Sequence, residues 1–342
     1  MGLALRILSK ILLRALPGRM QAPDTRSIPY PMSISEQARA ALAVGAAREP
    51  MVIPRVDDVA GWRALVAKVD SQVEPFLDRI VASLAVSVEM QRIADIDVYF
   101  VSRQDLPDAQ RRKVNFHLHG GGWIFMGGRN CILPAAVAAA HFGGVVVAPD
   151  FRMPPNTPYP VPLDDALGAY RHVLERFDPA SVLVSGESSG GNLAAALMHR
   201  ARDAGMPQPG ALFLNTPVLD LTNAGDSLAT NRGLDIVLGD GTERMADLYR
   251  NGADPRCPYV SPLLGDLSRG FPRTYLRTGT RDLLLSESVR MHAALRKAGV
   301  ESDLYVGEAM PHAGFVVLGA ETPEDIDARN DLVRWLDRHW RC

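Results

Sequence analysis

The amino-acid sequence predicts an α/β fold, in which a mostly parallel central sheet carries helices on both faces. From about residue 91 to the C-terminus, short runs rich in Val, Ile and Leu alternate with helical patterns. Continuous apolar runs are typical of strands buried on both faces, and their alternation with helices indicates parallel pairing. The expected strands are 93–101, 114–118, 144–148, 181–185, 211–215, 273–278 and 303–306.

Composition excludes several classes of protein. The chain has 342 residues, enough for one large domain with a smaller addition. Its formal net charge of −2 gives no electrostatic case for nucleic-acid binding. Cys131, Cys257 and Cys342 lie far apart and in no metal-ligand spacing. We therefore expect no disulfide framework, no metal, and a cytoplasmic location in which thiols stay reduced.

Residues 1–20 have the pattern of a cationic amphipathic helix. Arg6, Lys10 and Arg14 recur every four residues among leucines and isoleucines, and Pro17 ends the pattern. These charges are atypical of a secretory signal, and the segment is too short to span a bilayer. We favour a helix that caps the mouth of a binding site. A membrane-surface helix that recruits lipid-like substrates stays open as the alternative.

The region before the first strand is helical. Helical patterns cover 34–47 and 59–86, with a break or kink expected at Pro75. A second segment without strand character, 222–259, lies between the strands 211–215 and 273–278. We predict a helical cap region over 1–88 and a main domain over 89–342, with 222–259 as an insertion that contributes to the cap. The alternative is that these helices only extend the core.

A glycine-rich loop, HGGGW at 119–123, directly follows the strand 114–118. Successive glycines leave backbone N–H groups free to donate to an oxygen that gains negative charge. Such a donor lowers the barrier to attack on an ester carbonyl by about 3 to 4 kcal/mol. We predict an oxyanion hole formed by the N–H groups of Gly121, Gly122 and Ser189. We expect His119 to anchor the glycine loop, to which Gly120 also belongs, by hydrogen bonds. His117 and His119 have no third ligand in metal-binding spacing.

The candidate nucleophile is Ser188, in the sequence GESSGG at 186–191. An apolar strand precedes it and an alanine-rich helical pattern follows it, so Ser188 lies on a sharp strand-to-helix turn. Gly186 and Gly190 flank it because so tight a turn leaves no room for a Cβ. An ordinary glycine-rich β-to-α loop is the alternative, and the other motifs argue against it.

Asp282 and His312 each lie just beyond the end of an expected strand. A neutral imidazole must take the proton of the serine, and a buried carboxylate must hold the other ring nitrogen protonated. The chain order serine, aspartate, histidine is the order expected of an α/β-hydrolase. Glu287 is a rival for the orienting acid, but its expected place on a helix makes it the weaker choice.

Together these motifs resemble those of the hormone-sensitive-lipase-like family of α/β-hydrolase esterases, over most of residues 90–340. A further signature, DFRMPPNTPYP at 150–160, resembles the family segment Asp-Tyr-Arg-Leu-Ala-Pro-Glu-x-Pro-Phe-Pro, and an acid follows it at Asp164 and Asp165. The chain departs from the family pattern at residues that support the site, which are Pro154, Asn156, Glu187 and Ser189.

The resemblance implies an α/β-hydrolase fold with a helical cap and a carboxylic ester hydrolase that acts on short to medium acyl chains without a cofactor. It is also compatible with a homodimer. From the residues themselves, we expect Arg152 to form an ion pair with Asp164 or Asp165 behind the nucleophile. Hydrolysis of lactones or acetylated small molecules would use the same three residues. A non-catalytic receptor on this fold is disfavoured because all three are present.

Overall fold

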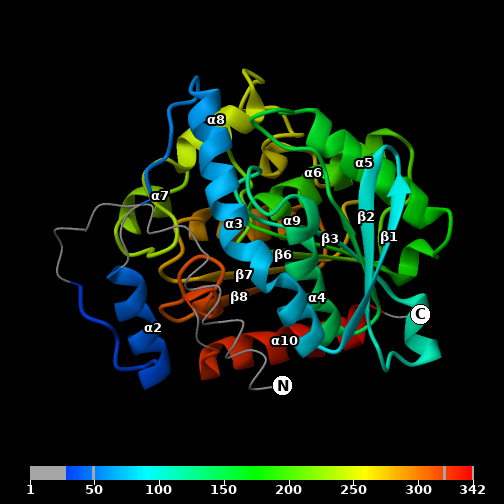
Figure 1. Ribbon diagram of the computed structural model, residues 1–342, viewed down its shortest axis with the longest axis horizontal. Coiled ribbons are helices and arrows are strands. Elements are labelled where there is room, and N and C mark those ends of the chain that lie inside the picture. The colour runs from blue at the N-terminus through cyan, green and yellow to red at the C-terminus, as the bar shows by residue number, and fades with distance from the viewer. Residues whose placement is uncertain (1–27, 48–50, 319–320, 341–342) are drawn as a thin grey trace.

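The computed structural model describes residues 28–47, 51–318 and 321–340, so the candidate helix 1–20 lies outside the described residues. A sheet of eight strands in the order β1-β2-β4-β3-β5-β6-β7-β8 forms the centre of this part of the chain (Figure 1). β2 pairs antiparallel with β1 and β4, and the pairs from β4 to β8 are parallel. The strands are β1 (Val86–Ile93), β2 (Ile96–Arg103), β3 (Val114–Leu118), β4 (Val145–Pro149), β5 (Val182–Glu187), β6 (Ala211–Asn215), β7 (Thr274–Gly279) and β8 (Ser302–Gly307).

Helices cover both faces of the sheet, as the sequence predicts. Buried side chains of α5 (Val161–Leu174), α6 (Ser189–Asp203) and α9 (Leu285–Lys297) pack on one face. On the other face, α4 (Ile132–Phe142) packs near β1, β2 and β4, and α10 (Pro323–His339) packs near β5 to β7. The remaining α-helices described are α2 (Glu36–Ala46), α3 (Val59–Ser83), α7 (Ser227–Thr230) and α8 (Thr242–Arg250).

Most of the expected strands are confirmed to within two residues, but the single strand expected over 93–101 is wrong. The structure has a hairpin there, in which β1 and β2 are joined at Ala94 and Asp95. Both residues have positive φ, 50° and 66°, as a tight hairpin turn requires. The turn lacks the Asn-Gly or Asp-Gly pair that usually marks such a position, which is why the sequence did not reveal it.

Of the break or kink expected at Pro75, the break is wrong, because α3 runs through this residue as a helix of 25 residues. Proline removes one backbone hydrogen bond from a helix interior. Val73, Leu77 and Ile80 lie on one side of α3, where they are buried against α4 and the β1–β2 hairpin. The burial of this apolar face on both sides of Pro75 outweighs the lost hydrogen bond.

The helical N-terminal region and the insertion 222–259 meet above the glycine loop. Trp62 and Val69 of α3 pack in one apolar cluster with Met245 of α8 and with Ile124 and Phe125, which follow the loop. In Figure 1, α8 lies beside the N-terminal end of α3, away from the β1–β2 edge of the sheet. No helix among the described residues combines the length and apolarity needed to cross a bilayer.

Candidate active site

Ser188 lies at the turn between β5 and α6, with the strained backbone angles φ 56° and ψ −120°. Only glycine fits at the two positions that flank Ser188, 186 and 190. A Cβ on Gly186 would lie 2.2 Å from the carbonyl oxygen of Gly190, and a Cβ on Gly190 would lie 2.0 Å from that of Leu118. The sharp strand-to-helix turn predicted from the sequence is therefore present, and it places the serine hydroxyl at the carboxyl end of the sheet.

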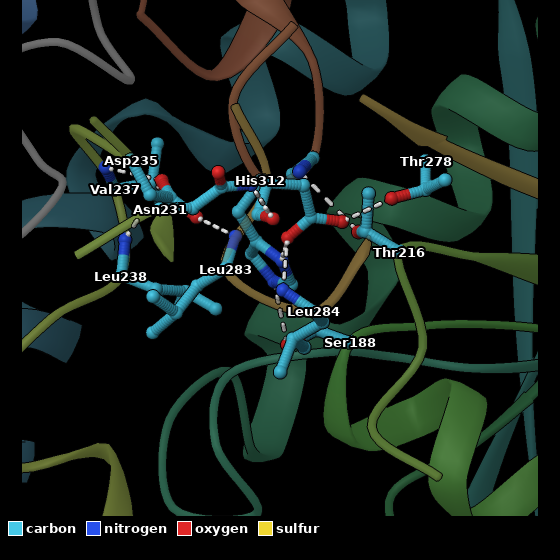
Figure 2. Close-up of polar contacts among 12 residues, drawn as sticks. Ser188, Thr216, Asn231, Asp235, Val237, Leu238, Thr278, Leu283, Leu284 and His312 are labelled. Atoms are coloured by element: carbon cyan, nitrogen blue, oxygen red, sulfur yellow. Dashed lines mark hydrogen bonds and ion pairs between the residues drawn. The ribbon is translucent and has the colours of Figure 1, made fainter. Parts of the chain in front are cut away.

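The structure brings Ser188, His312 and Asp282 together, although they come from three separate loops. Nε2 of His312 lies 2.9 Å from Oγ of Ser188, and its Nδ1 lies 3.1 Å from Oδ1 of Asp282 (Figure 2). A carboxylate only accepts hydrogen bonds, so Nδ1 carries the proton and Nε2 is left to accept from the serine hydroxyl. This arrangement can remove the serine proton during nucleophilic attack.

Opposing influences act on the pKa of His312. Burial alone lowers it, because the surroundings disfavour a charged imidazole. The charge and hydrogen bond of Asp282 raise it, and the nearby charges of Asp235 and Glu187 add to that effect. The carboxylates outweigh burial, so the pKa lies above its ordinary value. The site therefore stabilises the imidazolium that forms when the serine proton is transferred.

Asp282 is held by its own neighbours. Oγ1 of Thr278 donates to its Oδ2 at 2.6 Å, and the backbone N–H of Leu284 donates to its Oδ1 at 3.0 Å. The rival acid Glu287 has a different task, since it accepts hydrogen bonds from the backbone N–H groups of Leu219 and Asp220. Burial raises the pKa of Glu287 to about 8. Glu287 therefore stabilises a loop, and Asp282 is the acid that contacts the imidazole.

Asp235 is a member of this cluster that the sequence analysis missed. Its carboxylate, that of Asp282 and the His312 ring each have an atom within 4.8 Å of the others. Such a group could also be considered as a cation site. Both ring nitrogens of His312 are already engaged, however, which leaves no lone pair for an ion. Asp235 lies within the insertion, in no recognisable motif, so no sequence signal connected it with His312.

The glycine loop lies against the nucleophile. Gly121 and Gly122 have positive φ, 110° and 63°, and line the same cavity as Ser188. His119 anchors the loop as expected, because its Nδ1 lies 2.8 Å from the carbonyl oxygen of Gly120 and its ring stacks on Phe151. Burial lowers the pKa of His119 to about 4, so the ring is neutral.

The N–H group of Ser189 completes the set of donors that we predict for an oxyanion. Ser189 is the first residue of α6 and is buried. The first N–H groups of a helix have no partner within the helix, which leaves them available to an anion. Beside it, the carboxylate of Glu187 accepts a 2.6 Å hydrogen bond from the side-chain amide of Asn215.

Arg152 forms its ion pair with Asp165 and not with Asp164. The guanidinium contacts both oxygens of the buried Asp165, at 3.0 and 2.6 Å, and the backbone N–H of Arg152 adds a third bond at 2.9 Å. Asp164 instead faces Arg200 at 3.4 Å in an exposed pair, so its expected supporting role is wrong. Arg152 is itself half exposed and lines a surface depression separate from the cavity of Ser188.

A largely apolar cavity of about 390 Å³ opens beside Ser188. Besides the glycine loop and the residues around the triad, three parts of the chain contribute much of its apolar lining: α3 and the segment before it, α4, and the insertion 222–259. The polar side chains of Glu321, Asp325 and Arg329 also line it. Apolar lining residues are Met51, Val69 and Val73 from the first part, Leu133, Val137 and Ala138 from the second, and Ile236, Val237, Leu238 and Met245 from the third.

The chain is similar to known hydrolases and esterases in sequence and in structure. The model of the alpha/beta hydrolase fold family matches residues 115–316. An acetyl-hydrolase of Streptomyces hygroscopicus is 34% identical over 195 residues, which are 56% of this chain and 65% of that protein. The crystal structure of an esterase, E25, superposes with a TM-score of 0.82 at 33% identity, covering 94% of this chain and 99% of that one. An esterase of the bacterial hormone-sensitive lipase family superposes with a TM-score of 0.75 at 25% identity, covering 90% and 100%.

Proposed function

Because this chain belongs to the alpha/beta hydrolase fold family, with esterases of the hormone-sensitive lipase family among its relatives, we propose that it hydrolyses carboxylic esters through an acyl-enzyme on Ser188. The observation that carries the proposal is the continuous hydrogen-bonded chain from Ser188 through His312 to Asp282. A serine hydroxyl is a weak nucleophile until an adjacent base removes its proton. This chain of contacts supplies that base and holds it in the required tautomer.

The reaction proceeds in two halves. Oγ of Ser188 bonds to the ester carbonyl carbon while its proton moves to Nε2 of His312, and the carbonyl oxygen becomes an oxyanion near the N–H groups of Gly121, Gly122 and Ser189. The bond from carbon to the alcohol oxygen then breaks, and His312 returns the proton to the departing alcohol. A water molecule repeats the attack on the acyl-enzyme, which releases the acid and restores Ser188.

The cavity supports a small-molecule ester with an apolar acyl chain of short to medium length. Its volume of about 390 Å³ lies at the low end of the range for small-molecule sites. We assign its cover to a cap made of the region 1–88 and the insertion 222–259, because both contribute apolar lining residues. Such a cap excludes water from the oxyanion. Membrane contact through residues 1–20, a homodimer and a cytoplasmic location stay predictions from the sequence.

The test is turnover of p-nitrophenyl esters from acetate to palmitate by the full chain and by Ser188→Ala. We expect the parent protein to be most active on short and medium chains and the variant to lose turnover, since among the described residues it is the Ser188 hydroxyl that hydrogen-bonds to Nε2 of His312. A fluorophosphonate should label the parent protein at Ser188 and leave the variant unlabelled. Full turnover by Ser188→Ala would reject the acyl-enzyme.

A further inference from the structure

Three side chains of the insertion, Ser227, Asn231 and Asp235, are spaced four residues apart and hydrogen-bond to the loop 280–283, which carries the catalytic acid Asp282. Oγ of Ser227 donates to the carbonyl oxygen of Leu283 at 2.7 Å. The side-chain amide of Asn231 donates to the carbonyl oxygens of Thr280 and Asp282, at 3.1 and 2.8 Å. These contacts hold the main chain on both sides of the Asp282 side chain.

Asp235 hydrogen-bonds both to the loop 280–283 and to residues of the cavity wall. Its Oδ2 accepts the N–H of Leu283 at 2.8 Å, and its Oδ1 accepts the N–H groups of Val237 and Leu238 at 2.9 and 3.2 Å (Figure 2). Val237 and Leu238 line the cavity beside Ser188. One buried carboxylate therefore bridges the segment that faces the substrate and the loop that carries Asp282.

Asp235 is also close enough to influence the charge of His312. It is 1% exposed and shares the same 4.8 Å cluster with the imidazole and Asp282. Burial first and the charge of Asp282 second raise the pKa of Asp235 to about 6, whereas His312 acts in the opposite direction. Two further carboxylates act on this cluster, Glu187 at the end of β5 on His312 and Glu287 on α9 near Asp282. Arg281 of the same loop donates from its guanidinium to the carbonyl oxygen of Pro29.

The three backbone N–H groups need both oxygens of a carboxylate, because a carboxamide has a single acceptor oxygen. A buried anion in this position becomes favourable when a neighbour gains positive charge, and His312 gains such a charge during each proton transfer. We propose that Asp235 and Asn231 are positioning residues of the insertion, which fix the loop 280–283 and so the carboxylate of Asp282, and that the charge of Asp235 further stabilises protonated His312. This inference rests on the esterase mechanism proposed above.

The test measures kcat, KM and the pH profile of kcat/KM for p-nitrophenyl butyrate with Asp235→Asn and Asn231→Ala. Both variants should lower kcat by about tenfold and change KM little, a smaller loss than removal of a direct oxyanion donor causes. Loss of the negative charge should also shift the acidic limb of the profile to lower pH in Asp235→Asn. Asn231→Ala removes no charge, so its acidic limb should stay at the parent position.

Asp220→Asn is the matched control. Asp220 is another buried carboxylate next to the insertion, but its partners are Thr222 and Arg290, and it neither lines the cavity nor contacts the loop 280–283. Its kcat and acidic limb should match those of the parent protein. A folded Asp235→Asn variant with the parent kcat and acidic limb would overturn the proposal. If Asp235→Asn does not fold, the test rests on Asn231→Ala. A kcat equal to that of the parent protein in Asn231→Ala would overturn the positioning role. An inactive parent protein would instead reject the esterase mechanism itself.

Discussion

The protonation state of His312 sets the pH range in which Ser188 can be activated. Burial lowers the pKa of this imidazole, but Asp282, Asp235 and Glu187 outweigh burial, so the pKa lies above that of an ordinary histidine. As the pH falls through the pKa of His312, Nε2 takes up a proton and can no longer accept one from Ser188. We expect kcat/KM to decline on the acidic side with a midpoint above the pKa of free histidine, and this midpoint to move to lower pH in Asp282→Asn. A parent midpoint below that of free histidine would contradict this account.

Gly121 tests the oxyanion hole without touching the three catalytic side chains. It has φ 110°, and a Cβ would lie 2.5 Å from the carbonyl oxygen of Phe125. Gly121→Ala must therefore move the loop and misdirect its N–H groups. We expect kcat to fall by about a hundredfold. The control is Gly128→Ala, which also has a positive φ but no atom within 4 Å of the new Cβ. Equal losses of kcat in the two variants would argue against an oxyanion role.

Helix α5 offers two adjacent carboxylates with different surroundings. Asp165 is buried against Arg152, whereas Asp164 is about half exposed opposite Arg200. Asp165→Asn removes the charge of a buried acceptor that holds three donors of the half-exposed Arg152, and it should lower the free energy of unfolding by about 1 to 3 kcal/mol. Asp164→Asn should change it by less than about 0.5 kcal/mol. Urea denaturation measures both, and a larger loss in Asp164→Asn would reverse the assignment of the ion pair.

The strands and helices that the sequence predicted well are those with strong local patterns. The buried runs 114–118 and 211–215 agree residue for residue with β3 and β6, because mostly apolar runs of this length favour strands buried on both faces. Prediction failed where contacts between residues distant in sequence determine the local structure. The hairpin at Ala94 follows from pairing between β1 and β2, and the continuity of α3 through Pro75 follows from its burial on α4.

The residues of the candidate site also divide into those that the sequence could predict and those that it could not. Ser188, Asp282 and His312 could be predicted because each lies a few residues or less beyond the end of a strand, and the carboxyl ends of parallel strands meet at one edge of the sheet. Asp235 could not, since nothing in the spacing connects residue 235 with residue 282. Similarly, the sequence left Asp164 and Asp165 equivalent, and only the orientation of α5 directs one of them inward. Side chains brought together by tertiary packing carry no local signal.

The complete fold brings α3, α4 and the insertion around one cavity, so substrate size should depend on residues far from one another in sequence. α4 belongs to the catalytic domain and lies against the sheet, whereas α3 and the insertion belong to the proposed cap. Val137 of α4 lines the cavity without contacting the triad. A substitution at Val137 should therefore change which acyl chain lengths are accepted without changing the reaction at Ser188.

Val137→Trp should shorten the range of acyl chains that the enzyme accepts. The indole would occupy space in a cavity of about 390 Å³, so kcat/KM for p-nitrophenyl octanoate should fall at least about tenfold while that for the acetate changes little, because the loss of even one methylene contact is worth roughly 1 kcal/mol or more. Val44→Trp, at a half-exposed position of α2 outside the cavity lining, should leave the profile unchanged. An equal loss on acetate and octanoate in Val137→Trp would mean that the acyl chain binds elsewhere.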